Sequence, residues 1–154
     1  MNARIDTLPL PSEAELLELG TRAFQGLGLH EADARQVSRI LVTADLFGLG
    51  THGLSRIESY GERLAVGGIN PRPQIAVQKV APALCKVDGD NGIGPLVGMR
   101  ALEAAMEAAR ECGVGVALAR GSNHFGPISP YSLIAAEAGF ASIIGGTATT
   151  TIAP

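Results

Sequence analysis

Residues 48–53 read Gly-Leu-Gly-Thr-His-Gly, and the structure that this stretch adopts decides between two classes of fold. Its spacing matches GxGxxG, which in dinucleotide-binding folds joins a strand to the helix whose amino terminus holds a pyrophosphate. Residues 37–47 before it have helical periodicity, and no acidic residue ends a second strand about 20 residues after it. We therefore expect these glycines to end one helix and begin another, outside any Rossmann fold.

Three helices are expected around this stretch. Residues 12–15, Ser-Glu-Ala-Glu, form a capping box, and the apolar residues after it recur at helical spacing until two glycines break the pattern. A second helix is predicted over residues 31–47, with acidic residues in its first turn and one apolar stripe. A third is predicted from about Thr51 to Ala65, closed by two glycines and followed by a proline-flanked linker.

Beyond the linker the apolar period changes from helical to strand-like. The expected elements are strands over 75–80 and 83–87, a Gly-rich turn over 88–94, a helix over 96–110, a buried strand over 114–119, a helix over 130–138 capped by Ser129, and a strand over 140–144. We therefore expect an α+β chain, with a helical amino-terminal subdomain over residues 1–72 and an incomplete α/β domain over residues 73–154.

The composition excludes several classes of partner. The net charge of −3 comes from 15 acidic and 12 basic residues without a Lys/Arg run, so nucleic acid is not an expected partner. The amino terminus lacks the apolar stretch of a signal peptide, and the longest uncharged stretch, residues 138–154, is rich in Gly and Thr. We expect a cytoplasmic protein without a membrane segment.

The thiols and imidazoles do not form a metal-binding pattern. Cys85 and Cys112 have no CxxC partner, and the three histidines form no HxxxH or HxH pair. We expect reduced thiols and no metal site. A mean hydropathy of +0.23, few aromatic residues and an end directly after an expected strand further suggest a fragment with apolar surface to bury.

The third predicted helix carries a set of polar side chains suited to chemistry. At 100° per residue, His52, Arg56, Tyr60 and Arg63 would fall within about an 80° arc of one helix face. Arginine grips a carboxylate through two hydrogen bonds, and histidine exchanges a proton near neutral pH, so this face would suit a small carboxylate substrate. The alternative is an ordinary solvated helix face with His52 as a surface or capping residue.

A second polar group lies in the loop predicted between a strand and a helix. Residues 122–126 read Ser-Asn-His-Phe-Gly, and loops at this place in α/β proteins commonly hold binding groups. Gly121 and Gly126 bracket the loop and would let its backbone approach a phosphate or a nicotinamide closely. The alternative is a tight turn in which Asn123 and His124 only satisfy local hydrogen bonds.

In their order and spacing, these motifs resemble the malate/L-lactate dehydrogenase family, the non-Rossmann group that includes ureidoglycolate, sulfolactate and 2,3-diketo-L-gulonate oxidoreductases. The resemblance covers about residues 12–154 and rests on the following motifs: Thr51-His52-Gly53 with Arg56 and Tyr60, Gly67-Gly68-Ile69-Asn70-Pro71, Val87-Asp88-Gly89, Gly92-Ile93-Gly94, Gly121 to Gly126, Tyr131, and Ala153-Pro154. It implies a helical amino-terminal subdomain, a cofactor-binding domain of unusual topology, and a homodimer with active sites near the subunit interface. It also implies that a complete member is much longer than 154 residues.

The resemblance implies NAD or NADP as cofactor and a small 2-hydroxy acid or 2-oxo acid as substrate. His52 would be the proton donor and acceptor, oriented by Thr51, and Arg56 would anchor the substrate carboxylate with Tyr60 beside it. The loop of Ser122, Asn123, His124, Phe125 and Gly126 would face cofactor and substrate, with His124 a rival acid/base. Two alternatives to a 2-hydroxy-acid dehydrogenase stay open. The protein would be a cyclic-imine carboxylate reductase of the same family, or the chain would be an inactive fragment that serves at most as a dimerising or binding module.

Three positions depart from the family's usual pattern. Thr51 stands where Ser is usual and keeps the hydroxyl, whereas Ser129 replaces a common Gly after the His124 loop. Thr147 falls where many members have Asn, which puts an amide contact to cofactor or substrate in doubt.

Overall fold

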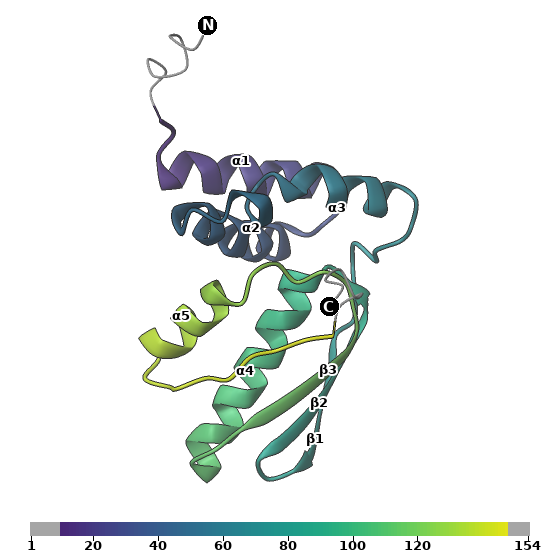
Figure 1. Cartoon of the computed structure of the whole chain (residues 1–154). Coiled ribbons are helices and arrows are strands. Elements are labelled where there is room, and N and C mark those ends of the chain that lie inside the picture. Colours follow the sequence, from purple (N-terminus) through teal and green to yellow (C-terminus); the bar gives the residue numbers. More distant parts are fainter. Residues whose placement is uncertain (1–9, 148–154) are drawn as a thin grey trace, which may run out of the picture.

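The computed structural model describes residues 10–147 and has two layers (Figure 1). The upper layer holds α1 (Glu13–Gly26), α2 (Glu31–Leu46), the short 3-10 helix η1 (Gly50–His52) and α3 (Arg56–Ala65). The lower layer holds α4 (Gly94–Cys112), α5 (Ser129–Glu137) and a three-stranded sheet of β1 (Ala76–Ala81), β2 (Leu84–Gly92) and β3 (Val116–Ser122). Residues 148–154, with the Ala153-Pro154 motif of the resemblance, lie outside the described residues. The expected α+β fold is confirmed.

The first two helices begin where local chemistry predicts. At α1 the backbone N–H of Ser12 donates to Glu15 Oε2 at 2.8 Å, and the N–H of Glu15 donates to Ser12 Oγ at 3.3 Å. This reciprocal capping box satisfies two donors that the helix itself leaves unpaired. The predicted helix over residues 31–47 is confirmed as α2, and because α2 rather than a strand precedes residues 48–53, the GxGxxG match is no dinucleotide fingerprint.

The sheet joins an antiparallel hairpin to a parallel crossover. β1 pairs with β2 antiparallel, and β3 pairs with β2 parallel after the chain passes through α4. α4 covers the face of the sheet that carries Cys85, whose side chain packs against Ala104 and Ala108. Because β2 and β3 are parallel, their carboxyl ends lie side by side beneath the helical layer, where the loop after β3 begins (Figure 1).

Helix α2 lies between two parts of the core. On one side Val37 and Leu41, both fully buried, pack with Phe24 of α1 and Tyr60 of α3. On the other side Ile40 packs with Tyr131 of α5 and with residues of α4. Because one helix contributes to both clusters, α2 fixes the helical layer against the lower layer and thereby the two groups of site residues against each other.

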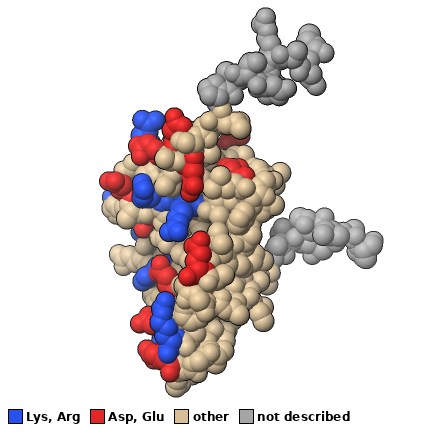
Figure 2. Space-filling view, turned by 90° about the vertical axis from the view of Figure 1, so that its left-hand side faces the viewer, with Lys and Arg blue, Asp and Glu red and all other residues tan. Residues whose placement is uncertain are grey.

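Surface charges of both signs are mixed on the face seen in Figure 2. Lys and Arg alternate there with Asp and Glu along one side, and a broad area of uncharged residues covers the rest of that face. Ion pairs between neighbouring side chains occur on two helices, Arg22 with Glu18 on α1 and Arg100 with Glu103 on α4. Within residues 10–147, no helix is both long and apolar enough to span a membrane.

The predicted third helix is wrong in its first turn. Residues 50–52 form η1, and α3 begins only at Arg56, so His52 does not lie on the face of α3. Gly53 adopts an extended conformation with φ −91° and ψ −148°, which breaks the helix between the two segments. The polar face predicted for one helix therefore comes from two elements, and Tyr60 is buried rather than on a solvated face.

Three predictions about the lower layer are also wrong. Strand β3 is largely exposed, with 59% of Leu118 accessible, because α4 covers only one face of the sheet and β2 alone pairs with β3 among the described residues. The Gly-rich turn predicted over residues 88–94 is mostly the end of β2. Residues 140–144 form no strand, since the N–H of Phe140 donates to Ala135 O and continues the end of α5.

The predicted cap of α5 is wrong as well. Ser129 is the first helical residue and Ile128 takes the capping position. The Ser129 hydroxyl is buried and has no hydrogen-bond partner in the part of the chain that the structure describes. A serine cap accepts the N–H of the second or third helical residue, but the N–H groups of Tyr131 and Ser132 donate to Ile128 O instead.

Candidate active site at the junction of the two layers

His52 is held in place by the end of α2. Asp45 Oδ2 accepts a hydrogen bond of 2.8 Å from the backbone N–H of Leu54, two residues after His52. The approach is so close that a Cβ on Gly53 would lie 1.8 Å from Asp45 Oδ1. The carboxylate of α2 therefore anchors the chain that carries His52, and glycine is required beside it. Thr51 Oγ1 lies 2.9 Å from His52 Nδ1.

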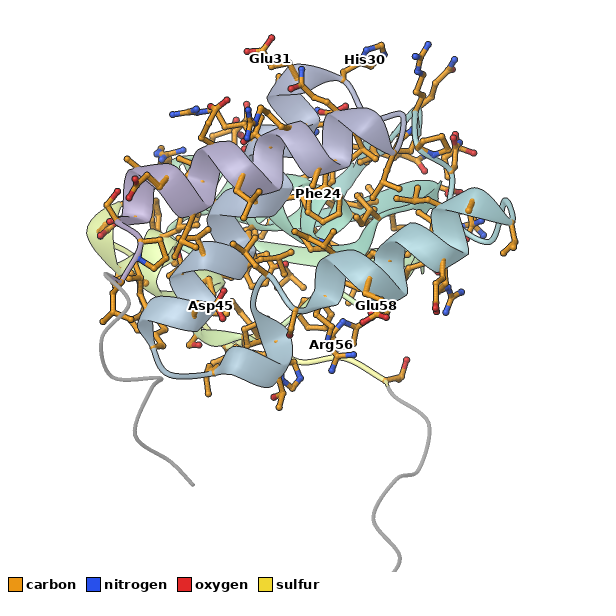
Figure 3. All side chains as sticks on the ribbon, turned by 90° about the horizontal axis from the view of Figure 1, so that it is seen from above. Phe24, His30, Glu31, Asp45, Arg56 and Glu58 are labelled. Atoms are coloured by element: carbon orange, nitrogen blue, oxygen red, sulfur yellow. The ribbon has the colours of Figure 1, made fainter. Side chains whose placement is uncertain are left out.

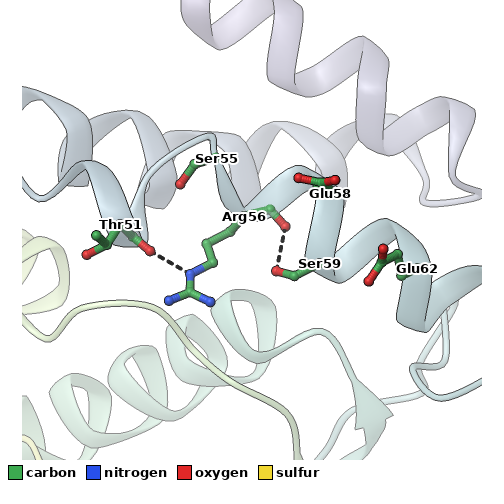
Figure 4. A pocket seen from close by; sticks show the side chains of 6 residues that line it. All are labelled: Thr51, Ser55, Arg56, Glu58, Ser59 and Glu62. Atoms are coloured by element: carbon green, nitrogen blue, oxygen red, sulfur yellow. Dashed lines mark hydrogen bonds between the residues drawn. The ribbon is translucent and has the colours of Figure 1, made fainter.

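Arg56 is tied to the same turn by one of its nitrogens. Its Nε donates to Thr51 O at 2.6 Å, and its terminal guanidinium nitrogens make no hydrogen bond within the described residues. Figure 4 shows the side chain extending from α3 alongside η1. It lines an open cavity of about 440 Å³ together with Thr51, Ser55, Glu58, Ser59 and Glu62. The guanidinium is thus oriented by the protein while its paired N–H groups stay available for a carboxylate.

Tyr60 connects α3 to the loop after β3. Its ring is 3% exposed and packs near Phe24, with ring centroids 6.5 Å apart. Its Oη lies 2.7 Å from His124 Nδ1 and 3.2 Å from His124 O. Burial raises the pKa of Tyr60 to about 12, so the phenol keeps its proton at neutral pH and donates to His124.

The two histidines predicted for the site meet in the structure. The ring centroids of His52 and His124 lie 5.5 Å apart, although η1 and the loop after β3 are far apart in the sequence. Burial lowers the pKa of His124, and the positive charges of Arg56 and of protonated His52 lower it further. His124 is therefore biased towards its neutral form, in which one ring nitrogen accepts a hydrogen bond.

The third histidine lies elsewhere. Figure 3 shows His30 and Glu31 at one edge of the helical layer and Arg56 at the opposite edge. His30 is the residue before α2 and its side chain makes no capping hydrogen bond. Among residues 10–147 no three His, Cys, Asp or Glu side chains are close enough to hold a metal ion.

The loop of residues 122–126 is held by contacts with α4 and with α5. A Cβ on Gly94 of α4 would lie 2.1 Å from His124 O, so the backbones of the helix and the loop are in direct contact. At its end, Tyr131 Oη of α5 donates to Phe125 O at 2.5 Å, and the two rings pack 5.6 Å apart. Gly126 has a φ of 79°, a conformation that glycine adopts without strain.

Sequence reasoning named Arg63 and Gly94 but missed their contacts with Asn123 and His124, and it missed Asp45 and Asn91 as site residues. Their roles depend on contacts between segments far apart in the chain, for which no local pattern exists. The only sequence signals were the glycine at position 94 and the asparagine at position 91, both inside a stretch interpreted as a turn. Each is typical of a place where the backbone approaches another chain segment or has a positive φ.

Residues 48–53 follow a helix and not a strand, and the sheet is small and mixed, so the chain is an α+β protein outside the Rossmann group. The family model described as malate/L-lactate dehydrogenase matches residues 12–154, and the chain belongs to this family. The family consists of NAD(P)-dependent dehydrogenases of 2-hydroxy acids.

Several characterised proteins are similar to the chain. Malate dehydrogenase of Pyrococcus horikoshii is 40% identical over 122 residues, which are 79% of this chain and 34% of that protein. L-sulfolactate dehydrogenase of Methanocaldococcus jannaschii is 43% identical over 108 residues, 70% of this chain and 31% of that protein. Ureidoglycolate dehydrogenase (NAD(+)) of Escherichia coli is 34% identical over 116 residues, 75% of this chain and 33% of that protein.

The structural comparison agrees with the sequence comparison. A solved structure of malate dehydrogenase from Pyrococcus horikoshii OT3 superimposes with a TM-score of 0.81 and 38% identity, covering 86% of this chain and 38% of that one. The chain thus spans about a third of the length of the curated relatives it matches.

Proposed function

We propose that the protein containing this chain is an oxidoreductase that transfers a hydride between NAD(P) and a small 2-hydroxy acid or 2-oxo acid. The observation that carries the proposal is the meeting of His52, His124 and Arg56 at one place, with Arg56 oriented but its terminal nitrogens unpaired among the described residues. Family membership supports the reaction type, since the family consists of such dehydrogenases.

In this reaction the C–H bond of the carbinol carbon breaks and its hydride goes to C4 of the nicotinamide. The O–H bond breaks as well, its proton goes to a histidine, and the carbon–oxygen bond becomes a carbonyl. A positioned general base typically contributes on the order of 10² to 10⁴-fold to such a step. NAD(P) supplies the two-electron acceptor, and the residues described here bind the acid and move the proton.

We assign the proton transfer to His52 and a hydrogen-bonding role to His124. His124 is biased towards its neutral form by burial and by Arg56, which makes it a poor proton acceptor, and Tyr60 occupies its Nδ1. His52 has Thr51 at Nδ1, so its Nε2 is the nitrogen left for the substrate hydroxyl. Arg56 would bind the substrate carboxylate through its two terminal nitrogens, with Tyr60 holding the neighbouring loop.

The loop of Ser122 to Gly126 is proposed to face the cofactor and the substrate. Its glycine-flanked backbone and the exposed edge of His124 support this placement, since close backbone approach is what a flat nicotinamide ring requires. The part of the relatives beyond the matched third of their length would complete the cofactor site.

The test is a steady-state assay of the complete encoded protein with NADH or NADPH and a panel of 2-oxo acids. We expect reduction of at least one 2-oxo acid, a loss of about 10²-fold or more in kcat for His52→Ala, and a rise in KM for Arg56→Ala. An unimpaired His52→Ala enzyme would assign the proton transfer elsewhere. Arg56 would hold a cyclic-imine carboxylate equally well, so such an imine belongs in the panel as the second candidate substrate.

Homodimerisation is part of the same proposal. The apolar side chains of Leu46, Phe47 and Leu49 are between 38% and 57% exposed at the turn that leads into η1, close to His52. Exposed apolar residues grouped near a site commonly mark a subunit contact. Light scattering on the complete protein should give twice the mass of one chain, and a monomer at micromolar concentration would contradict the proposal.

The competing hypothesis is that the 154-residue chain alone is inactive and serves at most as a dimerising or binding module. Its span of about a third of the relatives' length supports this alternative. Assaying the isolated chain beside the complete protein separates the two, because turnover of NADPH by the isolated chain would exclude an inactive module.

A further inference from the structure

Asn123, the residue directly before His124, has protein partners for both its amide nitrogen and its amide oxygen. Its Nδ2 lies 3.1 Å from Asn91 O, 3.1 Å from Asn91 Oδ1 and 3.0 Å from Gly92 O. Its Oδ1 accepts a hydrogen bond of 3.0 Å from Arg63 Nη2. An amide nitrogen has two hydrogens, so three acceptors at these distances leave no donor for a ligand.

The acceptors belong to an irregular end of β2. The pairing of β2 with β3 shifts register between Asp88 and Gly92, and there Asp90 and Asn91 have φ values of 50° and 54°. Residues other than glycine in this left-handed region cost free energy, although Asn and Asp tolerate it best. Such conformations persist where surrounding contacts fix them, and they are concentrated at functional sites.

Asn70 stabilises the irregular end of β2 from outside. Its backbone N–H donates to Asn91 O at 2.9 Å, and its Nδ2 donates to Asp90 Oδ2 at 3.0 Å. The carbonyl of Asn91 therefore accepts from both Asn70 and Asn123. These bonds hold the irregular end of β2, the bulge, in a shape in which the carbonyl groups of Asn91 and Gly92 face the loop after β3.

The other partner comes from the helical layer. Arg63 is on α3, one turn beyond Tyr60, and Tyr60 is the residue that bonds to the ring of His124. The loop is thus held by α3 at two neighbouring points, at the Asn123 amide and at the His124 imidazole. Asn123 connects the bulge of β2 to α3, and both hold the backbone just before His124.

We propose that Asn123 is a positioning residue whose amide seats the loop so that the imidazole of His124 meets Tyr60 and His52, and that it makes no side-chain contact with the nicotinamide cofactor. The inference rests on the proposed function only in placing His124 in the active site. It narrows the role of the Ser122 to Gly126 loop, because the cofactor would then meet the loop through its backbone and His124.

The first test uses NMR titration of His124 in the 154-residue chain. In Asn123→Ala the loop loses its partners, so we expect the pKa of His124 to rise towards the ordinary histidine value and the Tyr60–His124 contact signals to disappear. An unchanged far-UV circular dichroism spectrum shows that the variant is folded. Asn91→Ala, which removes one acceptor, should shift His124 in the same direction by a smaller amount.

Ser122→Ala is the matched control, since the Ser122 hydroxyl donates only to the neighbouring Asn123 O at 3.2 Å. It should leave the His124 titration and the Tyr60–His124 contact signals unchanged. An unchanged His124 titration and unchanged Tyr60 contacts in folded Asn123→Ala would overturn the proposal. This measurement needs no catalytic activity, so it stands or fails independently of the proposed dehydrogenase reaction.

The second test uses the complete protein and distinguishes positioning from cofactor binding. A misplaced catalytic group lowers turnover, so Asn123→Ala should reduce kcat on the order of 10 to 10²-fold with little change in KM for the cofactor. A raised KM for NAD(P) with unchanged kcat would instead show a direct cofactor contact and would overturn the proposal.

Discussion

Replacing Gly94 by alanine tests whether the contact between α4 and the histidine loop is as close as the structure indicates. A Cβ at this position would lie 2.1 Å from His124 O, 2.3 Å from His124 C and 2.5 Å from Asn123 O. All three neighbours are backbone atoms, so no side-chain rotation relieves the overlap. Helix and loop must separate by about 1 Å to restore an ordinary contact in a close-packed region.

The expected cost follows from overpacking. Extra atoms in a well-packed site destabilise by about 1–3 kcal/mol, and little of this is returned as helix propensity because Gly94 is the first residue of α4. A loss of about 1–3 kcal/mol lowers Tm by roughly 2–12 °C for a chain of this size. The displaced loop should also weaken the Tyr60–His124 hydrogen bond, which NMR of the imidazole detects.

The assay is thermal unfolding followed by circular dichroism on the 154-residue chain, with Gly26→Ala as the control. Gly26 lies in α1 with an ordinary φ, and a Cβ there would meet nothing within 4 Å, so this variant should match or exceed wild-type Tm. If Gly94→Ala melts within about 1 °C of Gly26→Ala and leaves the His124 signals unchanged, the reasoning is refuted.

Three further outcomes follow from the site. Gly53→Ala should lower the free energy of unfolding in urea by about 1–3 kcal/mol, because the methyl group displaces the Asp45 carboxylate and leaves the N–H of Leu54 unpaired. Asp45→Ala should lower it by a similar amount. If neither variant is affected, the Asp45 carboxylate does not anchor this turn. Tyr60→Phe removes the hydrogen bond between Tyr60 Oη and His124 and should lower the free energy of unfolding by about 1 kcal/mol in the same urea titration. An unchanged far-UV spectrum is the control that the variant keeps its helices. The pKa of His124 in the folded chain lies below the ordinary 6.5, so the unfolded chain binds more protons as the pH falls through that value, and the free energy of unfolding declines. His124→Gln should show a shallower decline of the unfolding free energy between about pH 7.5 and 5.5. An identical pH dependence in wild type and variant would refute the shift.

Much of the helical layer follows from local sequence. The capping box at Ser12 and the apolar stripe of residues 31–47 specify α1 and α2, because hydrogen bonds and side-chain spacing within one helix decide both. The helical periodicity of the residues before Gly48 is also sufficient to exclude a dinucleotide fingerprint over residues 48–53, because that fingerprint follows a strand. Such features depend on residues within a few positions of each other.

The lower layer was predicted less well, for a physical reason. Whether a strand is buried, or exists at all, depends on partners that the local sequence does not name, since its N–H and C=O groups must be paired by another segment. The apolar stretch of β3 therefore reads as buried although Leu118 is exposed, and residues 140–144 read as a strand although they pair with none.

The sequence by itself determined which side chains are available for chemistry: the imidazoles of His52 and His124, the guanidinium of Arg56 and the phenol of Tyr60. Only the tertiary structure decided how they meet. His52 leaves the predicted helix face because Asp45 binds the chain beyond it. Tyr60 turns inward, where its ring packs near Phe24 and its hydroxyl lies 2.7 Å from His124 Nδ1. The Asp45 contact joins two segments of the helical layer and the Tyr60–His124 contact joins the two layers, so tertiary packing and not local periodicity fixes their geometry.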